Sequence, residues 1–170
     1  MKEQVHPFVE YLESLRDNRA ALAALRRGLG QPPGTVADMY RYVVRWLPDD
    51  AKPWREAAYY QIAALFAYHP AEGGQGNMGR HFDAVRRQDP NADHTALERR
   101  FTALLAAHPE DLDFYLRQAV SFLRSKEVPI NWQRLFYDLR RWGYENRPAQ
   151  RDWARAFWGR PKEPKTTEKE

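Results

Sequence analysis

The basic residues of this 170-residue chain are mostly arginine, and arginine is the residue type here that most directly suggests chemistry. Of the 27 basic residues 21 are arginine and 6 are lysine, against 23 acidic residues, so the formal net charge is +4. A guanidinium group is planar, binds two phosphate oxygens at once and stacks on nucleobases. The bias therefore favours a nucleic-acid partner. The alternative is that the arginines form salt bridges on solvated helix faces.

The spacing of the arginines places several of them on common helix faces. Intervals of four and seven residues correspond to one and two helical turns. Sets with these intervals are Arg19 and Arg26, Arg117 and Arg124, and Arg147, Arg151 and Arg155. Four arginine doublets lie at residues 26–27, 86–87, 99–100 and 140–141. We expect them at the rims of packed faces, where they can follow a phosphate backbone. The acidic residues near enough to neutralise some of them are Asp83, Asp138, Glu145 and Asp152.

The residue types that catalysis requires are absent or isolated. The chain has no cysteine, its five histidines show no HExxH spacing, and no GxSxG segment surrounds a serine. Glu110, Asp111 and Asp113 form the densest acidic cluster, but they stand where the first turn of a helix is expected, and carboxylates there stabilise the helix dipole. We therefore predict no catalytic residue, no metal and no cofactor, and a protein that is not an enzyme.

One segment, Gly74–Gly79, satisfies the GxGxxG pattern of dinucleotide-binding loops. That loop requires a preceding strand and a βαβ unit around it, whereas a helix is expected before this segment. We interpret the segment as a flexible linker. The alternative is that backbone amides at the start of the next helix, together with Arg80, bind a nucleic-acid phosphate.

Apolar residues recur at helical spacing along nearly the whole chain, and no period-two run indicates a strand. The sequence therefore predicts an all-α fold of about eight to nine helices in two small bundles packed into one compact protein. The expected helices span about 5–16, 19–29, 35–47, 53–68, 78–88, 95–107, 110–126 and 132–142, and the last starts at Pro148. Their caps are expected at Thr35 with Asp38, at Thr95 with Glu98, and at Asn131. The tryptophans interpreted as packing residues are Trp132, Trp142, Trp153 and Trp158.

The stretch HPAEGGQGN, residues 69–77, is the clearest internal boundary in the sequence. We predict an N-terminal helical lobe at 1–70, a glycine-rich linker at 71–77, a C-terminal helical lobe at 78–159 and a disordered tail at 160–170. No apolar run approaches 18 residues and the start shows no secretion signal. A soluble, cytoplasmic protein without membrane contact is expected.

Five segments occur in an order that is more specific than any one of them. They are AALAALRRGLGQPP (20–33), MYRYVVRWLP (39–48), GNMGRHFDAVRRQ (76–88), NWQRLFYDLRRW (131–142) and WARAFW (153–158). This order, within about residues 5–158, resembles the CasB family, the small helical subunit of the type I-E CRISPR surveillance complex Cascade.

The resemblance implies a non-catalytic, all-helical scaffold of a CRISPR RNA-guided surveillance complex, in antiviral defence. The partners it implies are the backbone and large subunits of Cascade, guide RNA, target DNA and a second copy of the chain. Its arginine-rich surfaces would stabilise the pairing of guide RNA with target DNA and the displaced strand of the R-loop, without sequence specificity. The positions that the family pattern selects are Arg26, Arg27, Arg80, Arg99 and Arg100. The spacing argument adds Arg117 and Arg124, and Lys52 and Arg55 are secondary candidates.

The alternative function is a protein-only helical adaptor whose arginines are solvated surface charges. The sequence leaves open which arginines contact which strand, and the oligomeric state and nucleic-acid affinity of the isolated protein.

Overall fold

The computed structural model describes residues 5–159, and every regular element in that range is a helix. The elements are α1 (Pro7–Ser14), α2 (Arg19–Arg26), the 3-10 helix η1 (Ala37–Met39), α3 (Tyr40–Val43), the 3-10 helix η2 (Val44–Trp46), α4 (Pro53–Tyr68), α5 (Met78–Gln88), α6 (Thr95–Ala106), α7 (Leu112–Ser125), α8 (Trp132–Leu139) and α9 (Pro148–Trp158). The predicted all-α fold is confirmed. The predicted tail at 160–170 lies outside the described residues.

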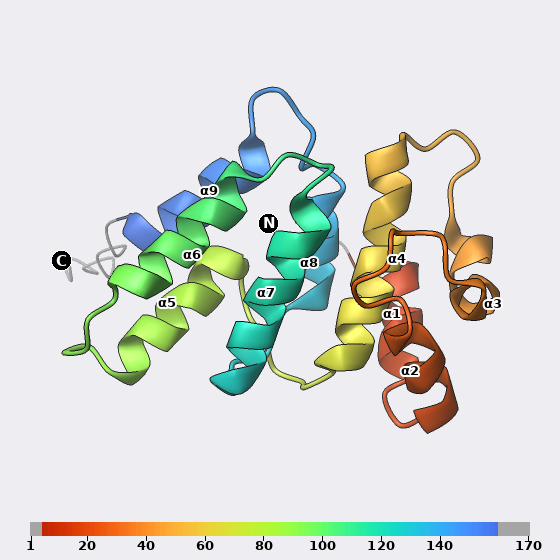
Figure 1. Ribbon diagram of the computed structural model, residues 1–170, viewed down its shortest axis with the longest axis horizontal. Helices are drawn as coiled ribbons and strands as arrows, with labels where there is room; N and C mark the ends of the chain where they lie inside the picture. The colour runs from red at the N-terminus through yellow and green to blue at the C-terminus, as the bar shows by residue number, and fades with distance from the viewer. Residues whose placement is uncertain (1–4, 160–170) are drawn as a thin grey trace, which may run out of the picture.

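Helix α4 forms the core of the half of the molecule that also contains α1, α2 and α3 (Figure 1). Pro53 occupies its first position, as predicted, because a missing amide hydrogen costs nothing there. Residues 58–67 are all buried, which requires neighbours on every side. Helices α2, α3, α7 and α8 supply these neighbours. The end of α4, at Tyr68, is thereby held beside α7.

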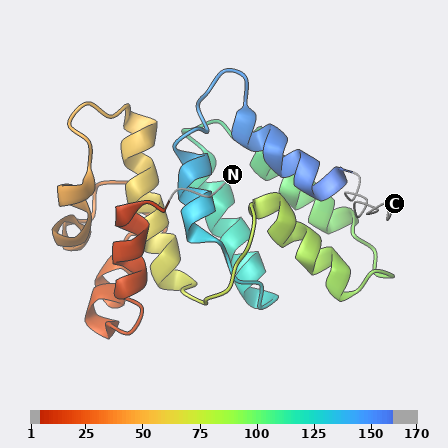
Figure 2. The same cartoon turned by 180° about the vertical axis from the view of Figure 1, so that it is seen from behind.

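In the other half, α5 packs along α9 (Figure 2), and α6 packs against α7. Gly79 permits the close approach of α5 to α9, since a Cβ atom there would lie 2.0 Å from the carbonyl oxygen of Trp153. A Cβ atom at Gly74 would lie 2.2 Å from the carbonyl carbon of Ile130. The outer glycines of the GxGxxG match therefore let backbone segments pack closely.

The single helix predicted at 35–47 is wrong, because the segment folds as η1, α3 and η2 in succession. The predicted cap formed by Thr35 and Asp38 is also wrong. The Thr35 hydroxyl donates to the carbonyl oxygen of Pro32 at 2.6 Å and so closes the preceding turn. Asp38 instead pairs with Arg27. Both side chains have thus bonded to groups outside the segment that they were expected to cap.

The capping box predicted from Thr95 and Glu98 is wrong as well, because Thr95 is already the first residue of α6. His94 is the N-cap and forms no side-chain cap bond, and Asp93 binds the first residue of the helix instead. Its Oδ1 accepts hydrogen bonds from the Thr95 amide at 2.9 Å and from the Thr95 hydroxyl at 2.7 Å. The predicted cap at Asn131 is confirmed, since its Oδ1 accepts a hydrogen bond from the amide of Arg134 at 3.0 Å.

Several helix ends differ from their predicted bounds, among them those of α1, α2 and α8 and the start of α7, whereas α9 begins at Pro148 as predicted. Helix α7 begins at Leu112, so that Glu110 and Asp111 precede it and only Asp113 of the acidic cluster lies in its first turn. Arg147 was expected on the face of α9 but precedes the helix with φ of 52°, and its guanidinium donates to the carbonyl oxygen of Leu105.

Three of the four tryptophans interpreted as packing residues are buried, namely Trp132, Trp142 and Trp153. Trp158 is 46% exposed at the end of α9, but its ring packs on the core, with centroid distances of 5.3 Å to Phe101 and 4.9 Å to Phe157.

Helix α8 connects the two halves, since it packs against α4 and α1 although it follows α7 in the sequence. The lobe boundaries at residues 70 and 78 stay a prediction. None of the helices within residues 5–159 is long and apolar enough to cross a membrane.

His81 joins α5 to the start of α8 through a buried hydrogen bond. Its side chain is 3% exposed, and its Nε2 accepts a hydrogen bond from the amide of Asn131 at 3.1 Å. Burial, with smaller contributions from Arg80 and His69, lowers the pKa of His81 to about 4. The ring is therefore neutral at pH 7, and its protonation would remove the acceptor.

We expect this histidine to make the folded state less stable as the pH falls from about 6.5 toward 4. In that window the unfolded chain binds a proton at His81 that the folded chain does not bind. The lowered pKa of about 4 corresponds to about 3 kcal/mol over the full window. Urea unfolding of the wild type and of His81→Gln at about pH 7 and pH 4.5 measures this effect.

The variant should show a weaker loss of stability on acidification, because a glutamine accepts the hydrogen bond without titrating. Burial raises the pKa of Asp138 to about 6, so protonation of Asp138 stabilises the folded state on acidification. This effect is present in both proteins and cancels in the comparison. An equal loss of unfolding free energy on acidification in the two proteins would contradict the assignment of this effect to His81.

The replacement Gly79→Ala should lower the free energy of unfolding by about 1–3 kcal/mol, because α5 must move away from the Trp153 carbonyl to admit the methyl group. Thermal unfolding measures the change. Ala96→Ser, at an exposed position of α6, is the control and should change stability by no more than about 0.5 kcal/mol. An unchanged melting temperature for Gly79→Ala would show that α5 and α9 are not closely packed at Gly79.

Candidate nucleic-acid interface

Helix α7 has one face in the core and another that carries arginines. The buried residues are Leu112, Leu116, Ala119, Val120 and Leu123. Arg117, Ser121 and Arg124 lie on the other side, as their spacing predicts. Arg124 is exposed and Arg117 is half-buried. The apolar face thus fixes the helix and directs these polar side chains outward.

A groove follows the polar face of α7, and we refer to it as the α7 groove. Its lining includes Leu29 after α2, Tyr68 at the end of α4, Arg100 of α6, and Arg117, Phe122 and Lys126 of α7 and its C-cap. None of the nine lining residues is acidic. Segments far apart in the sequence therefore bring three cationic side chains and two aromatic rings to one surface.

Aromatic rings hold several of the cations in place. The Cζ atom of Arg100 lies 4.3 Å from the ring centroid of Phe122, and that of Arg124 lies 4.5 Å from the ring centroid of Tyr68. The Nζ atom of Lys126 lies 5.9 Å from the centroid of Phe122. A ring attracts a cation through its quadrupole and carries no net charge. These contacts therefore position the cations without neutralising them.

Tyr68 also connects α4 to α7 beside the groove. Its hydroxyl lies 3.3 Å from the Oγ of Ser121. Hydrogen bonding lowers the pKa of Tyr68 from its ordinary value, and Ser121 contributes more to this shift than Arg124 does. The position of Arg124 is thus set by both the ring and the hydroxyl of one tyrosine.

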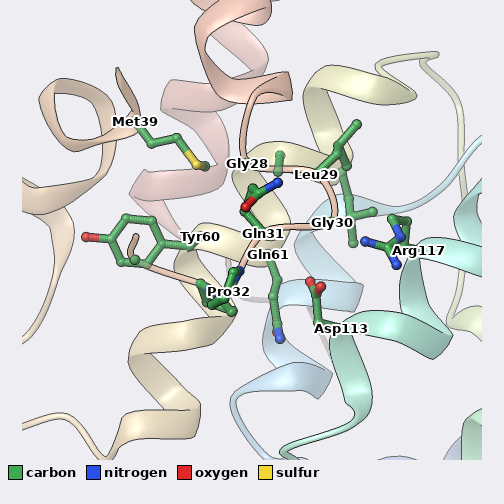
Figure 3. A pocket seen from close by; sticks show the side chains of 14 residues that line it. Gly28, Leu29, Gly30, Gln31, Pro32, Met39, Tyr60, Gln61, Asp113 and Arg117 are labelled. Carbon is green, nitrogen blue, oxygen red and sulfur yellow. The ribbon is translucent and has the colours of Figure 1, made fainter. Parts of the chain in front are cut away.

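Arg117 lies between the α7 groove and the loop that follows α2. Figure 3 shows Arg117 and Asp113 extending from α7 toward the loop that contains Gly30. A Cβ atom at Gly30, where φ is 74°, would lie 2.6 Å from Nη1 of Arg117. Burial raises the pKa of Asp113, and the charge of Arg117 opposes that shift. The cavity shown there measures about 10 Å³, enough for about one water molecule and too small for an organic ligand.

Arg80 lies in a separate groove between α5 and α9. This groove contains Asp83 and Asp152, each ion-paired with other arginines. The amide of Arg80 donates to Oδ1 of Asn77, so the cap already binds one of the amides that were considered for a phosphate. The structure therefore does not bring Arg80 to the α7 groove.

The remaining predicted site residues lie on α2 and α6. Arg26 ends α2, Arg27 follows as its C-cap and Arg99 is exposed on α6. Arg27 pairs with Asp38 at 2.7 Å. It is the only one of the seven predicted arginines that forms an ion pair with a carboxylate of residues 5–159.

The sequence did not indicate three residues of the α7 groove, namely Tyr68, Phe122 and Lys126. Spacing gave no signal for Lys126, because residues two apart, such as Arg124 and Lys126, do not share a helix face. Tyr68 and Phe122 could not have been found either, because each contacts a cation from a different helix or turn and apolar spacing assigns aromatic residues to packing.

Two buried histidines are engaged in bonds to the backbone. Nε2 of His69 lies 2.7 Å from the carbonyl oxygen of Val128, and His81 accepts from the backbone as described above. Between residues 5 and 159 no group of three or more His, Cys, Asp or Glu side chains is arranged to hold a metal ion.

The fold and the groove define a class of protein: an all-helical protein with a cationic surface groove that has no acidic lining. Comparison with known proteins specifies the family. The family model described as CRISPR-associated protein Cse2 matches residues 21–158. A CRISPR-associated protein Cse2 of Thermus thermophilus is 34% identical over 158 residues, which are 89% of this chain and 88% of that protein. The chain belongs to the Cse2 family.

Solved structures agree with this assignment. The crystal structure of CasB from Thermus thermophilus has a TM-score of 0.77 at 33% identity and covers 90% of this chain and 96% of that chain. A chain of a solved CRISPR RNA-guided surveillance complex has a TM-score of 0.77 at 29% identity, with 88% of both chains covered. The resemblance to CasB seen in the order of the motifs is therefore confirmed.

Proposed function

We propose that this chain is a non-catalytic subunit of a CRISPR RNA-guided surveillance complex and that its α7 groove holds a nucleic-acid strand by the phosphates. The α7 groove carries the proposal, because cations meet there without an acidic residue in the lining. The similar chain within a solved surveillance complex supports the assignment to such a complex. The strand held is either the target strand paired with guide RNA or the displaced strand of the R-loop.

The groove suits binding without sequence specificity. Guanidinium groups and aromatic rings contact phosphates and base faces, which are common to all sequences, whereas specificity requires contacts to base edges. In this role base pairing with the guide RNA selects the target. The exchange of a DNA duplex for an RNA–DNA duplex is nearly balanced in free energy, so a few phosphate contacts are enough to favour the R-loop.

The protein partners in this role are the backbone and large subunits of the complex and a second copy of the chain, in the cytoplasm. Exposed apolar side chains of α3 and η2 are available for such contacts. Tyr40 is 41% exposed and Val44 is 49% exposed. Exposed apolar groups that lie near each other are typical of protein interfaces.

A protein-only adaptor is the second candidate function. It is favoured by the ion pairs of Arg16, Arg27 and Arg86 with carboxylates, which show that part of the arginine content serves the structure. In that case the cations of the α7 groove are solvated and do not contact a strand.

The affinity for single-stranded DNA should fall steeply with salt concentration, and removing groove cations should make the fall less steep. For single strands the logarithm of affinity changes with the logarithm of salt concentration by about −0.7 per neutralised phosphate. Replacing Arg100 and Arg117, which line the groove, and Arg124, which lies beside it over Tyr68, with alanine should therefore reduce the magnitude of the slope by about 2. Fluorescence anisotropy with a labelled oligonucleotide between about 50 and 200 mM salt measures it.

Arg87→Ala is the control for each removed arginine, because it removes one guanidinium that already lies 2.8 Å from the Asp83 carboxylate. Its slope should stay close to that of the wild type. Equal changes in the triple variant and the control, or an affinity that does not depend on salt, would contradict phosphate contacts in the α7 groove.

Charge reversal in the assembled complex distinguishes the two candidate functions. With Arg100, Arg117 and Arg124 replaced by glutamate, the chain should still copurify with its partner subunits but the complex should bind target DNA less tightly, because the groove then repels phosphates. Gel-shift titration of the purified complex measures the affinity. Full target affinity of the charge-reversed complex would favour the adaptor.

A further inference from the structure

A second groove gathers arginines where α8 meets α1 and α4, and we refer to it as the α8 groove. It is lined in part by Arg55 and Tyr59 of α4, Tyr137 of α8, and Arg140, Arg141 and Tyr144 after α8. None of its ten lining residues is acidic. It is built from elements other than those of the α7 groove, apart from α4, which contributes different residues to each.

Arg140 is a half-buried cation without an acidic partner. Its Cζ atom lies 4.4 Å from the ring centroid of Phe136, and its buried Nε has no hydrogen-bond partner in the described structure. Burial lowers the pKa of Arg140; Tyr59 opposes that shift and the like charge of Arg55 adds to it. Within residues 5–159 no carboxylate forms an ion pair with it. Its surroundings therefore disfavour its charge as long as no anion is bound.

Arg55 is held in a similar way. Its guanidinium donates to the hydroxyl of Tyr144, and its Cζ lies 5.4 Å from the Tyr144 ring centroid and 5.2 Å from that of Trp54. Its Nε is also buried and has no hydrogen-bond partner in the described structure. Two guanidiniums that repel each other are thus kept at one groove by aromatic rings.

Arg141 adds positive charge that its neighbouring acid neutralises only in part. It lies 3.7 Å from Oδ1 of Asp138. That fully buried carboxylate is already bonded at 3.1 Å by Arg134 and at 2.7 Å by Nε1 of Trp153. Asp138 therefore stabilises the core more than it serves the groove.

We propose that the α8 groove binds a phosphate group through Arg55 and Arg140, with the rings of Tyr137 and Tyr144 contacting the adjoining sugar or base. A phosphate offers more acceptor oxygens than a carboxylate and can therefore bond to two guanidinium forks at once. Tyr137 is 44% exposed and Tyr144 is 42% exposed, so their rings are accessible beside the cations. Arginine next to accessible aromatic rings is the arrangement that binds single-stranded nucleic acid. The ligand is a nucleotide, free or within a strand.

The inference that this nucleotide belongs to a strand rests on the proposed function, whereas the inference of a phosphate site does not. The probes are therefore inorganic phosphate, thymidine 5′-monophosphate, thymidine and a short oligothymidylate, titrated into the full-length isotope-labelled chain. Arginine Nε–H and tyrosine ring signals are followed by NMR. Phosphate should shift the Nε–H signals of Arg55 and Arg140 saturably, and thymidine should not. The monophosphate should bind more tightly than phosphate and shift the ring signals of Tyr137 and Tyr144.

Tighter binding of the oligothymidylate than of the monophosphate would assign the site to a strand, and equal binding would assign it to a free nucleotide. Arg140→Gln and Arg55→Gln should each weaken phosphate binding by about tenfold or more, because each removes charged hydrogen bonds. Arg151→Gln, at an exposed position of α9, is the control and should leave binding unchanged. Tyr144→Phe keeps the ring and removes only the hydroxyl partner of Arg55, so it tests the site if a glutamine variant fails to fold.

Absence of a saturable shift in the wild type would overturn the proposal, and so would tighter binding of a glutamate-rich peptide than of the phosphate compounds. The α7-groove variant with Arg100, Arg117 and Arg124 replaced by alanine should keep the phosphate shifts. Salt-dependent DNA binding without these shifts would refute this proposal alone. Phosphate shifts without salt-dependent DNA binding would refute only the role of the α7 groove.

Discussion

The proposed binding depends on positive charge that the fold holds at its surface without an acidic partner. Arg100 in the α7 groove and Arg124 beside it lie over aromatic rings, and Arg117 lies against the loop at Gly30. A ring holds a cation by about 0.5–1 kcal/mol at an exposed site and leaves its charge available to another anion. A carboxylate neutralises it, as Asp38 does for Arg27. The same residue type therefore serves binding or structure according to whether an acid stands beside it.

The helical core gives these cations fixed positions. The inner face of α7 is buried and α4 is enclosed on all sides, so that Tyr68 and Phe122 are presented by elements with little freedom to move. Gly79 lets α5 approach α9 closely, and His81 links α5 to α8 by a buried hydrogen bond. A surface held in this way loses less conformational entropy on binding than one made of mobile loops.

Sequence patterns correctly predicted the features that depend on a single helix. The all-α class, Pro53 at the start of α4, the cap at Asn131 and the shared face of Arg117 and Arg124 all follow from spacing within a helix, as the structure confirms. The caps at Thr35 and Thr95 were wrong because Pro32 and Asp93 offered bonds that the capping pattern does not consider. The contacts of Arg100 with Phe122 and of Arg124 with Tyr68 join separate helices, so no periodicity reveals them. The absence of acidic residues from both grooves likewise emerges only after folding.

The most direct test of the central claim is site-specific crosslinking in the assembled complex. A photoreactive amino acid placed at Gln118, which lines the α7 groove, should crosslink to a nucleic-acid strand when target DNA is bound. The same group at Ala96, an exposed position on α6 outside the lining of the groove, should not. Crosslinks from Gln118 to protein subunits alone would contradict the claim that the cations of this groove hold a strand.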